Sequence, residues 1–318
     1  GMGGVVLGIL VWQEGGEAVG VLLALGVAAL AGLAAWLVRR KRAGKPTLLD
    51  PALFSLALFR LGITGQMMQQ IALGGTMIAL PIFLQMVLEY NAMEAGLSIA
   101  PLSLSMFAVA LIAGKKAGGK RPASIILAGF VLLLIGLAAL IPLVPRVTTG
   151  WYLVIPLIIA GSGLGLLVSQ LNNYTLAPID EERVSEAAGV NSAAGSFGLS
   201  FGLAFGGAIM LATLSFSFTN LAEQSTVLNS EQQQQVADAL EHDAEIMTNT
   251  GLAEQITGQP AEVEEEIIRI NTDARPRALQ VALAIPIIAA LIGLFIAVRM
   301  RGKPDPQPNA DIEGLALG

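Results

Sequence analysis

Ionisable side chains that could carry out chemistry are scarce in the apolar parts of this chain. Proton transfer inside a membrane needs a buried acid or base, because the cost of burying its charge links protonation to conformation. The nearest carboxylates, Glu89, Glu94 and Glu186, lie at the ends of apolar segments. The single histidine is His242 and cysteine is absent, which argues against histidine metal clusters and excludes thiolate sites. We expect no catalytic residue, no metal site and no cofactor.

The polar side chains that the apolar segments do contain are amides. Gln66 and Gln70 are four residues apart and would share one face of a helix. Buried amides must find partners or line water. Two interpretations remain open: hydrogen bonds that fix helix packing, or a weakly polar cavity wall suited to bulky amphipathic substrates. The cavity candidates are Gln66, Gln69, Gln70, Gln85, Asn172, Asn173 and Asn191.

Small residues repeat along the uncharged stretch 187–214. Gly198, Gly202 and Gly206 stand four apart and would stack along one helix face. In lipid, such a row lets two helix backbones approach closely. The stretch is therefore predicted to be either a tightly packed helix or a gating helix whose smooth face slides or rocks against a neighbour.

The elements that position these residues are predicted to be membrane-spanning helices. The 318 residues are 54% hydrophobic and only 13% charged, unlike a typical soluble domain. A bilayer requires about 20 consecutive apolar residues. The fold class is therefore all-α, a polytopic membrane helix bundle. Complete spans are predicted at 18–38, 61–88, 95–114, 123–143, 151–173, 187–216 and 277–298, with a partial span at 3–12.

The basic residues predict how the spans are oriented, because Lys and Arg concentrate in cytoplasmic loops. If the basic cluster at 39–45 is cytoplasmic, alternation of the spans places all but four of the eighteen Lys and Arg on that side. We predict a multi-pass protein of the plasma membrane, with residues 39–60 and the C-terminus in the cytoplasm.

One polar segment, 218–275, interrupts the apolar pattern. It contains twelve acidic residues, and periodic apolar positions such as Val236 and Leu240 predict two or three amphipathic helices. Alternation of the spans places it outside the cell. It could cover the outer mouth of a cavity, bind a partner protein, or form a solvated cap without chemistry.

Several motifs, in order, resemble the major facilitator superfamily, specifically its fourteen-span drug:proton antiporter branch (EmrB/QacA type). Residues 80–85 (LPIFLQ) are similar to the LPxxLQ motif of that branch, and residues 89–97 (EYNAMEAGL) to the loop that follows it. Residues 161–165 (GSGLG) and 188–191 (AGVN) resemble the passage into its thirteenth span. The resemblance covers nearly the whole chain.

The resemblance implies two six-helix halves joined by two central spans, with substrate bound between the halves. On this basis 1–45 holds a truncated and a complete central span, 46–217 the first five spans of the C-terminal half, 218–275 the outer loop, 276–300 the last span and 301–318 the cytoplasmic tail. The expected partners are the lipid bilayer, an amphipathic substrate, protons and an N-terminal half that carries the proton-binding acids. No nucleic acid is expected.

One motif departs from the family pattern. The family loop G-x-x-x-D-[RK]-x-G-[RK] corresponds to GKKAGGKR, with Gly114, Lys115, Lys120 and Arg121 but no aspartate.

The expected function is proton-driven export of drugs or other amphipathic molecules by alternating access, without enzymatic activity. The alternatives are export of one specific metabolite or lipid, and a non-transporting membrane scaffold whose outer loop binds a partner.

Overall fold

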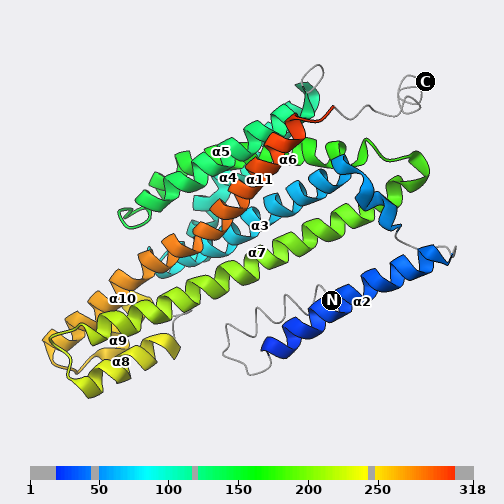
Figure 1. The fold of residues 1–318 in the computed structure, drawn as a ribbon. Coiled ribbons are helices and arrows are strands. Elements are labelled where there is room, and N and C mark those ends of the chain that lie inside the picture. The colour runs from blue at the N-terminus through cyan, green and yellow to red at the C-terminus, as the bar shows by residue number, and fades with distance from the viewer. Residues whose placement is uncertain (1–18, 44–49, 117–120, 243–247, 305–318) are drawn as a thin grey trace.

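The computed structural model describes residues 19–43, 50–116, 121–242 and 248–304, and the described residues form helices without strands. Figure 1 shows long helices running roughly along one direction. The partial span at 3–12 lies outside the described residues. The helices are α2 (Val19–Arg42), α3 (Ala57–Met86), α4 (Ala92–Lys116), α5 (Pro122–Leu143), α6 (Val154–Leu176), α7 (Glu181–Glu223), α8 (Ser230–His242), α9 (Asn249–Ile256), α10 (Ala261–Ala282) and α11 (Ala284–Arg301), with short 3-10 turns η1 (Pro51–Ser55) and η2 (Gly150–Leu153).

Six helical rods in the described part of the chain are long and apolar enough to cross a membrane. They are α3, α4, α5, α6 with η2, α7, and α10 joined to α11. The remaining predicted complete span, 18–38, is helical as α2. The all-α, polytopic membrane bundle expected from the sequence is confirmed.

Local signals determine where several of these helices begin and end. Asp50 caps η1, where its carboxylate accepts a hydrogen bond from the backbone N–H of Ala52 at 2.8 Å. Helix α5 starts with Pro122, at a position where the missing N–H would have no intrahelical partner. Helix α11 ends with Arg299 and Arg301, whose charges complement the negative end of the helix dipole.

Helix α3 is the centre of the bundle. It packs against α7 on one side and against α6 and α11 on others, while α6 also contacts α4 and α5. The approach between α11 and α5 is close, because a Cβ atom at Gly293 would lie 2.1 Å from a ring carbon of Phe130. Helix α2 has no extensive contact with the other described helices and lies apart from them in Figure 1. The core is therefore built from α3 to α7, α10 and α11.

Two rods extend well beyond the thickness of a bilayer. Helix α7 has 43 residues and is therefore about 64 Å long, roughly twice the hydrocarbon core. The rod of α10 and α11 covers Ala261–Arg301, with a break in the helix at Leu283. Helices α8 and α9 lie beside the projecting ends of α7 and α10 (Figure 1).

The polar segment expected at 218–275 does not begin and end where the helices do. Both of its expected boundaries fall inside helices, since α7 continues to Glu223 and α10 runs through position 276. The apolar stripe of α10, which includes Val263, Ile267 and Ile270, is buried and keeps this helix against α7. The segment thus consists of the end of α7, the two shorter helices α8 and α9, and the first part of α10.

Candidate functional site

The close contact between α3 and α7 is made by the glycines that the sequence singled out. A Cβ atom at Gly202 would lie 2.4 Å from the carbonyl oxygen of Ile71, and one at Gly198 would lie 2.7 Å from that of Met67. Gly206 packs against Gly75 of α3, with 3.2 Å from an added Cβ to its Cα. Such separations between backbones are possible only without side chains. We call this contact the glycine seam.

Two pairs of the predicted amides lie about one helical turn apart at one end of the seam. A Cβ atom at Gly195 would lie 3.5 Å from Nε2 of Gln66 and 3.7 Å from Cγ of Gln70, so both glutamines of α3 face α7 there. One turn earlier on α7, Asn191 Nδ2 donates a hydrogen bond to Asn172 Oδ1 of α6 at 3.0 Å. We call Gln66, Gln70, Asn172 and Asn191 the amide cluster.

Several polar atoms in this region have no hydrogen-bond partner among the described residues. They are Oε1 of Gln70, Oδ1 of Asn191 and both polar atoms of the Gln69 amide. Gln69 is completely buried. A buried polar group without a partner costs roughly 1–3 kcal/mol. A rearrangement that pairs or uncovers these groups would remove that cost.

Two other cavity candidates lie away from the cluster. Gln85 is 15 residues beyond Gln70 on α3, about 22 Å along the helix. Its Nε2 donates to the carbonyl of Pro81 at 3.3 Å. Asn173 is exposed on α6, next to Asn172, which is also exposed. The predicted cavity residues are thus brought together only in part.

An apolar groove lies alongside the glycine seam. It has a volume of about 350 Å³ and is formed by residues of α3, α7 and α11. Phe201 and Phe205 stack with ring centroids 5.3 Å apart on its α7 side. Met67 and Met68 contribute from α3, and flexible methionines adapt to irregular apolar partners.

The degenerate loop motif connects two helix ends. Gly114 and Lys115 are exposed in the last turn of α4, and Lys120 lies outside the described residues. Arg121, just before α5, donates from Nη2 to the carbonyl of Lys303 at 3.0 Å. Arg121 therefore ties α5 to the chain at the end of α11, a contact that helps to satisfy carbonyls left over by the helix.

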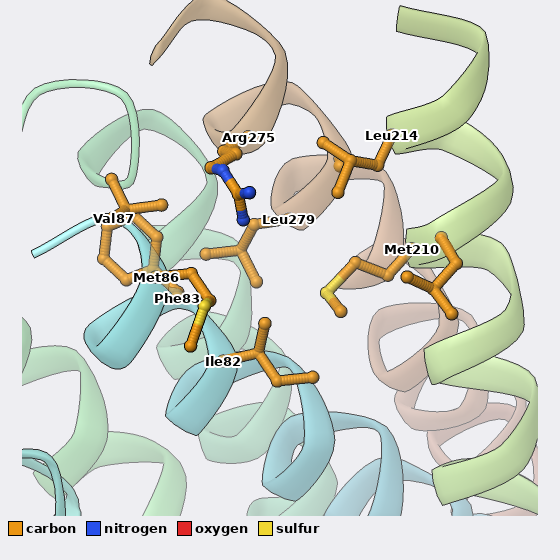
Figure 2. A pocket seen from close by; sticks show the side chains of 10 residues that line it. Ile82, Phe83, Met86, Val87, Met210, Leu214, Arg275 and Leu279 are labelled. Atoms are coloured by element: carbon orange, nitrogen blue, oxygen red, sulfur yellow. The ribbon is translucent and has the colours of Figure 1, made fainter. Parts of the chain in front are cut away.

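Arg275, which the sequence analysis placed in the outer polar segment, is a buried cation in the structure. Arg275 of α10 is 6% exposed and points toward α3 and α7 beside a small cavity of about 20 Å³ (Figure 2). Its neighbours there include Phe83, Met210 and Leu279. Arg275 and Asn271 continue the buried stripe of α10 with a spacing of four, which is the signal that could have located them.

A chain of polar contacts leads from Arg275 to the loop between α3 and α4. Arg275 Nε donates to Asn271 Oδ1 at 2.9 Å, and Asn271 Nδ2 donates to Asn249 Oδ1 at 2.7 Å. Glu89 accepts a hydrogen bond from the backbone N–H of Thr250 at 2.8 Å and another from its hydroxyl. These bonds, the hydroxyl one above all, hold the pKa of Glu89 below its ordinary value.

Comparison with known proteins identifies the same family along most of the chain. Residues 1–203 match the family described as the Major Facilitator Superfamily. The chain is 27% identical to a probable actinorhodin transporter of Streptomyces coelicolor over 65% of this chain and 35% of the relative. It is 28% identical to multidrug resistance protein Stp of Mycobacterium tuberculosis, over 64% and 37% of the two chains.

A third relative is the tetracycline resistance determinant of Streptomyces rimosus, with 29% identity over 63% of this chain and 57% of the relative. This chain therefore aligns with roughly a third to three fifths of the length of these three proteins.

Proposed function

Because the chain belongs to the Major Facilitator Superfamily, we propose that it forms the C-terminal helical half, with linker helix α2, of an exporter of amphipathic small molecules. The relatives named above are transporters or resistance proteins, which supports export. The transport path would lie between this half and an N-terminal half of the same protein.

The amide cluster is the observation that carries this proposal. Amide groups at the contact of α3, α6 and α7 offer donors and acceptors without net charge. Such a wall suits bulky, partly apolar molecules and holds a small anion poorly. Gln70 and Asn191 each keep a buried acceptor without a partner among the described residues, and a rearrangement of α3 and α7 that uncovers these acceptors would let them contact the substrate.

Alternating access would use the glycine seam. The faces of α3 and α7 meet through backbone atoms at Gly198 and Gly202, so few side chains interlock across this contact. A shift of α7 along α3 would have to keep small residues opposite these backbone atoms, and it would change which amides face one another. This would expose the amide cluster to one side of the membrane at a time.

Proton coupling would depend on acids outside this half. In the described spans, the carboxylates of α4 and α7 lie in the first or last turns or, for Glu186, in the second turn of α7. The others lie on α10 between Glu262 and Asp273, and α3, α5, α6 and α11 carry none. We infer that the proton-carrying acids belong to the N-terminal half.

We also infer that the protein lies in the plasma membrane, with residues 39–60 and the C-terminus on the cytoplasmic side.

Export of a single natural product is the second candidate. It is favoured by the actinorhodin transporter and the tetracycline determinant, which are named for individual compounds. The third, a scaffold whose segment with α8 and α9 binds a protein, is favoured by the solvated surface of α8, where Glu231, Gln234 and Gln235 are exposed.

The test is to read the genomic frame upstream of Gly1, express the complete frame and measure efflux of ethidium and of tetracycline from cells with and without a protonophore. We expect six further spans with a buried acid, and ethidium efflux that the protonophore abolishes. Efflux of tetracycline alone would favour the second candidate. Absence of any gradient-dependent efflux from a correctly inserted protein would refute export.

A further inference from the structure

A basic cleft lies between α3 and α11 at the end of the bundle opposite to α8 and α9. It has a volume of about 620 Å³. Arg60 lines it from α3, and Arg299 and Lys303 line it from the end of α11. None of the eight residues that line the cleft is acidic, and no carboxylate of the described residues forms an ion pair with these three cations. The cleft therefore concentrates positive charge.

The floor of the cleft is apolar. Leu61 of α3 and Phe295 and Ile296 of α11 complete its lining. Phe295 is 58% exposed in a membrane-spanning rod, so its ring is open to a lipid or to a ligand. The Arg299 guanidinium sits 4.8 Å from the centre of the Phe295 ring, at the transition from charged to apolar lining. A ligand of this cleft would need an anionic group and an adjoining apolar part.

The apolar groove described above continues the same contact between α3 and α11. Thr64 lines the cleft and Met67 and Met68 line the groove one turn further along α3. On α11, Phe295 lines the cleft and Ile292 and Ile288 line the groove. From Arg299 to Ile288 the helix advances about 16 Å, roughly half of the hydrocarbon core. Cleft and groove together match the depth of one leaflet.

We propose that this combined surface binds an anionic phospholipid, with the phosphate on Arg60, Arg299 and Lys303 and an acyl chain along Ile292 and Ile288. Basic pockets between membrane helices suit anionic head groups because both charges are partly withdrawn from water. A soluble anion would use only the cations and leave the exposed apolar side chains of the groove uncovered. The bound lipid would bridge α3 and α11 beside the glycine seam.

The test uses tryptophan quenching by brominated lipids in the full 318-residue chain. Phe295→Trp provides the reporter, and Trp12, Trp36 and Trp151 are replaced by Phe. In phosphatidylcholine nanodiscs, half-maximal quenching should need a several-fold lower mole fraction of dibrominated phosphatidylglycerol than of dibrominated phosphatidylcholine. Equal quenching by the two lipids would overturn the proposal.

The pocket variant combines Arg60→Gln, Arg299→Gln and Lys303→Gln, and it should lose the preference for phosphatidylglycerol. A matched variant removes three charges from the end of α2 (Arg39→Gln, Arg40→Gln and Arg42→Gln) and should keep it. Preference that survives in the pocket variant, or disappears equally in both, would refute the site. Relief of quenching by millimolar inorganic phosphate would assign the cleft to a soluble anion instead.

Two further measurements guard against misfolding of the variants. Arg60→Lys with Arg299→Lys keeps the charges and should keep the preference, whereas its loss would count against a charge-based site. Native mass spectrometry of the chain without the reporter should detect more retained phosphatidylglycerol than in the pocket variant. Equal retention, with equal helicity by circular dichroism, would overturn the proposal.

Discussion

Gln69 is the residue at which stability and function are expected to oppose one another. Its amide is completely buried, and neither polar atom has a partner among the described residues. Gln69→Met should raise the free energy of unfolding by roughly 1–3 kcal/mol, because the burial cost of the amide disappears. Unfolding in detergent measures this change. If the amide serves transport, efflux by the complete protein should fall.

The control for this variant lies on the same helix. Gln85→Met removes an amide that is only half-buried and that already donates to Pro81 at 3.3 Å. It should give no gain in stability. A loss of stability in Gln69→Met would indicate that the amide has a partner in the folded protein.

Glu89 makes the contact between the α3–α4 loop and α9 sensitive to acid. Its pKa is lowered in the folded chain by hydrogen bonds from Thr250. Ionised Glu89 therefore stabilises this contact fully above the pKa that Glu89 has in the unfolded chain. This stabilisation is lost as the pH falls through the lower pKa of Glu89 in the folded chain. Protection of α9 amides against hydrogen exchange, corrected for intrinsic rates, should drop between pH 6 and pH values below about 4.

Glu89→Gln should reduce this protection at pH 6 and remove most of its pH dependence. Glu94→Gln provides a comparison, since Glu94 accepts a hydrogen bond from the backbone N–H of Asn91 at the start of α4. An unchanged pH profile in Glu89→Gln would show that another group controls the contact.

At this scale the sequence predicted which residue types occupy the interior but not how they pair. Gln66, Gln69 and Gln70 lie within two helical turns, yet two face α7 and the third is fully buried without a partner among the described residues. Rotation of a helix about its axis decides this, and the hydrophobic pattern of a membrane helix sets that rotation weakly. Arg275 was missed for a different reason: its position on the apolar stripe of α10 signals burial, but a charged residue in a polar segment is expected to be solvated.

At the scale of helices, the glycine seam gives a graded prediction. Gly202→Ala should destabilise the bundle by about 1–3 kcal/mol, because its Cβ would lie 2.4 Å from the carbonyl oxygen of Ile71 and would force the helices apart. Gly195→Ala meets nothing closer than 3.5 Å and should be neutral or stabilising by up to about 1 kcal/mol. Unfolding in detergent compares the two variants, and equal effects would contradict the close packing.

The existence of the helices was predictable, while their ends were not. Continuous apolar stretches mark α3 to α7 and α11, because lipid requires every backbone group to be bonded within the segment. Helix α7 continues past its apolar part to Glu223, however, and α10 joins α11 with only a break at Leu283. Tertiary contact between α7 and α10 outside the apolar region stabilises these extensions, and hydropathy carries no information about that contact.

The whole molecule is a bundle with two distinguishable ends, and the proposed orientation can be tested directly. The chain has no cysteine, so single cysteines can be introduced without background. Ser230→Cys in α8 and Lys115→Cys in α4 are both at exposed positions. An impermeant maleimide should label position 230 in intact cells and position 115 only in inverted vesicles. The opposite pattern would reverse the orientation.

The all-helical membrane bundle and its family were predictable at this scale, whereas the contacts among helices were not. Which helix becomes central depends on shape complementarity between faces, such as Gly74 of α3 against Leu199 and Leu203 of α7. The basic cleft joins Arg60 to residues more than 200 positions later. A sequence read along its length gives no sign of that proximity.

The length of α7 has a mechanical consequence. A continuous helix about 64 Å long would carry a rotation at the glycine seam along its whole length. A small rotation there would be magnified toward Glu223, near the part of α7 that packs against α8 and α10. Distances measured between spin labels on α8 and on α5 would therefore report motions in the membrane interior that are too small to detect where they originate.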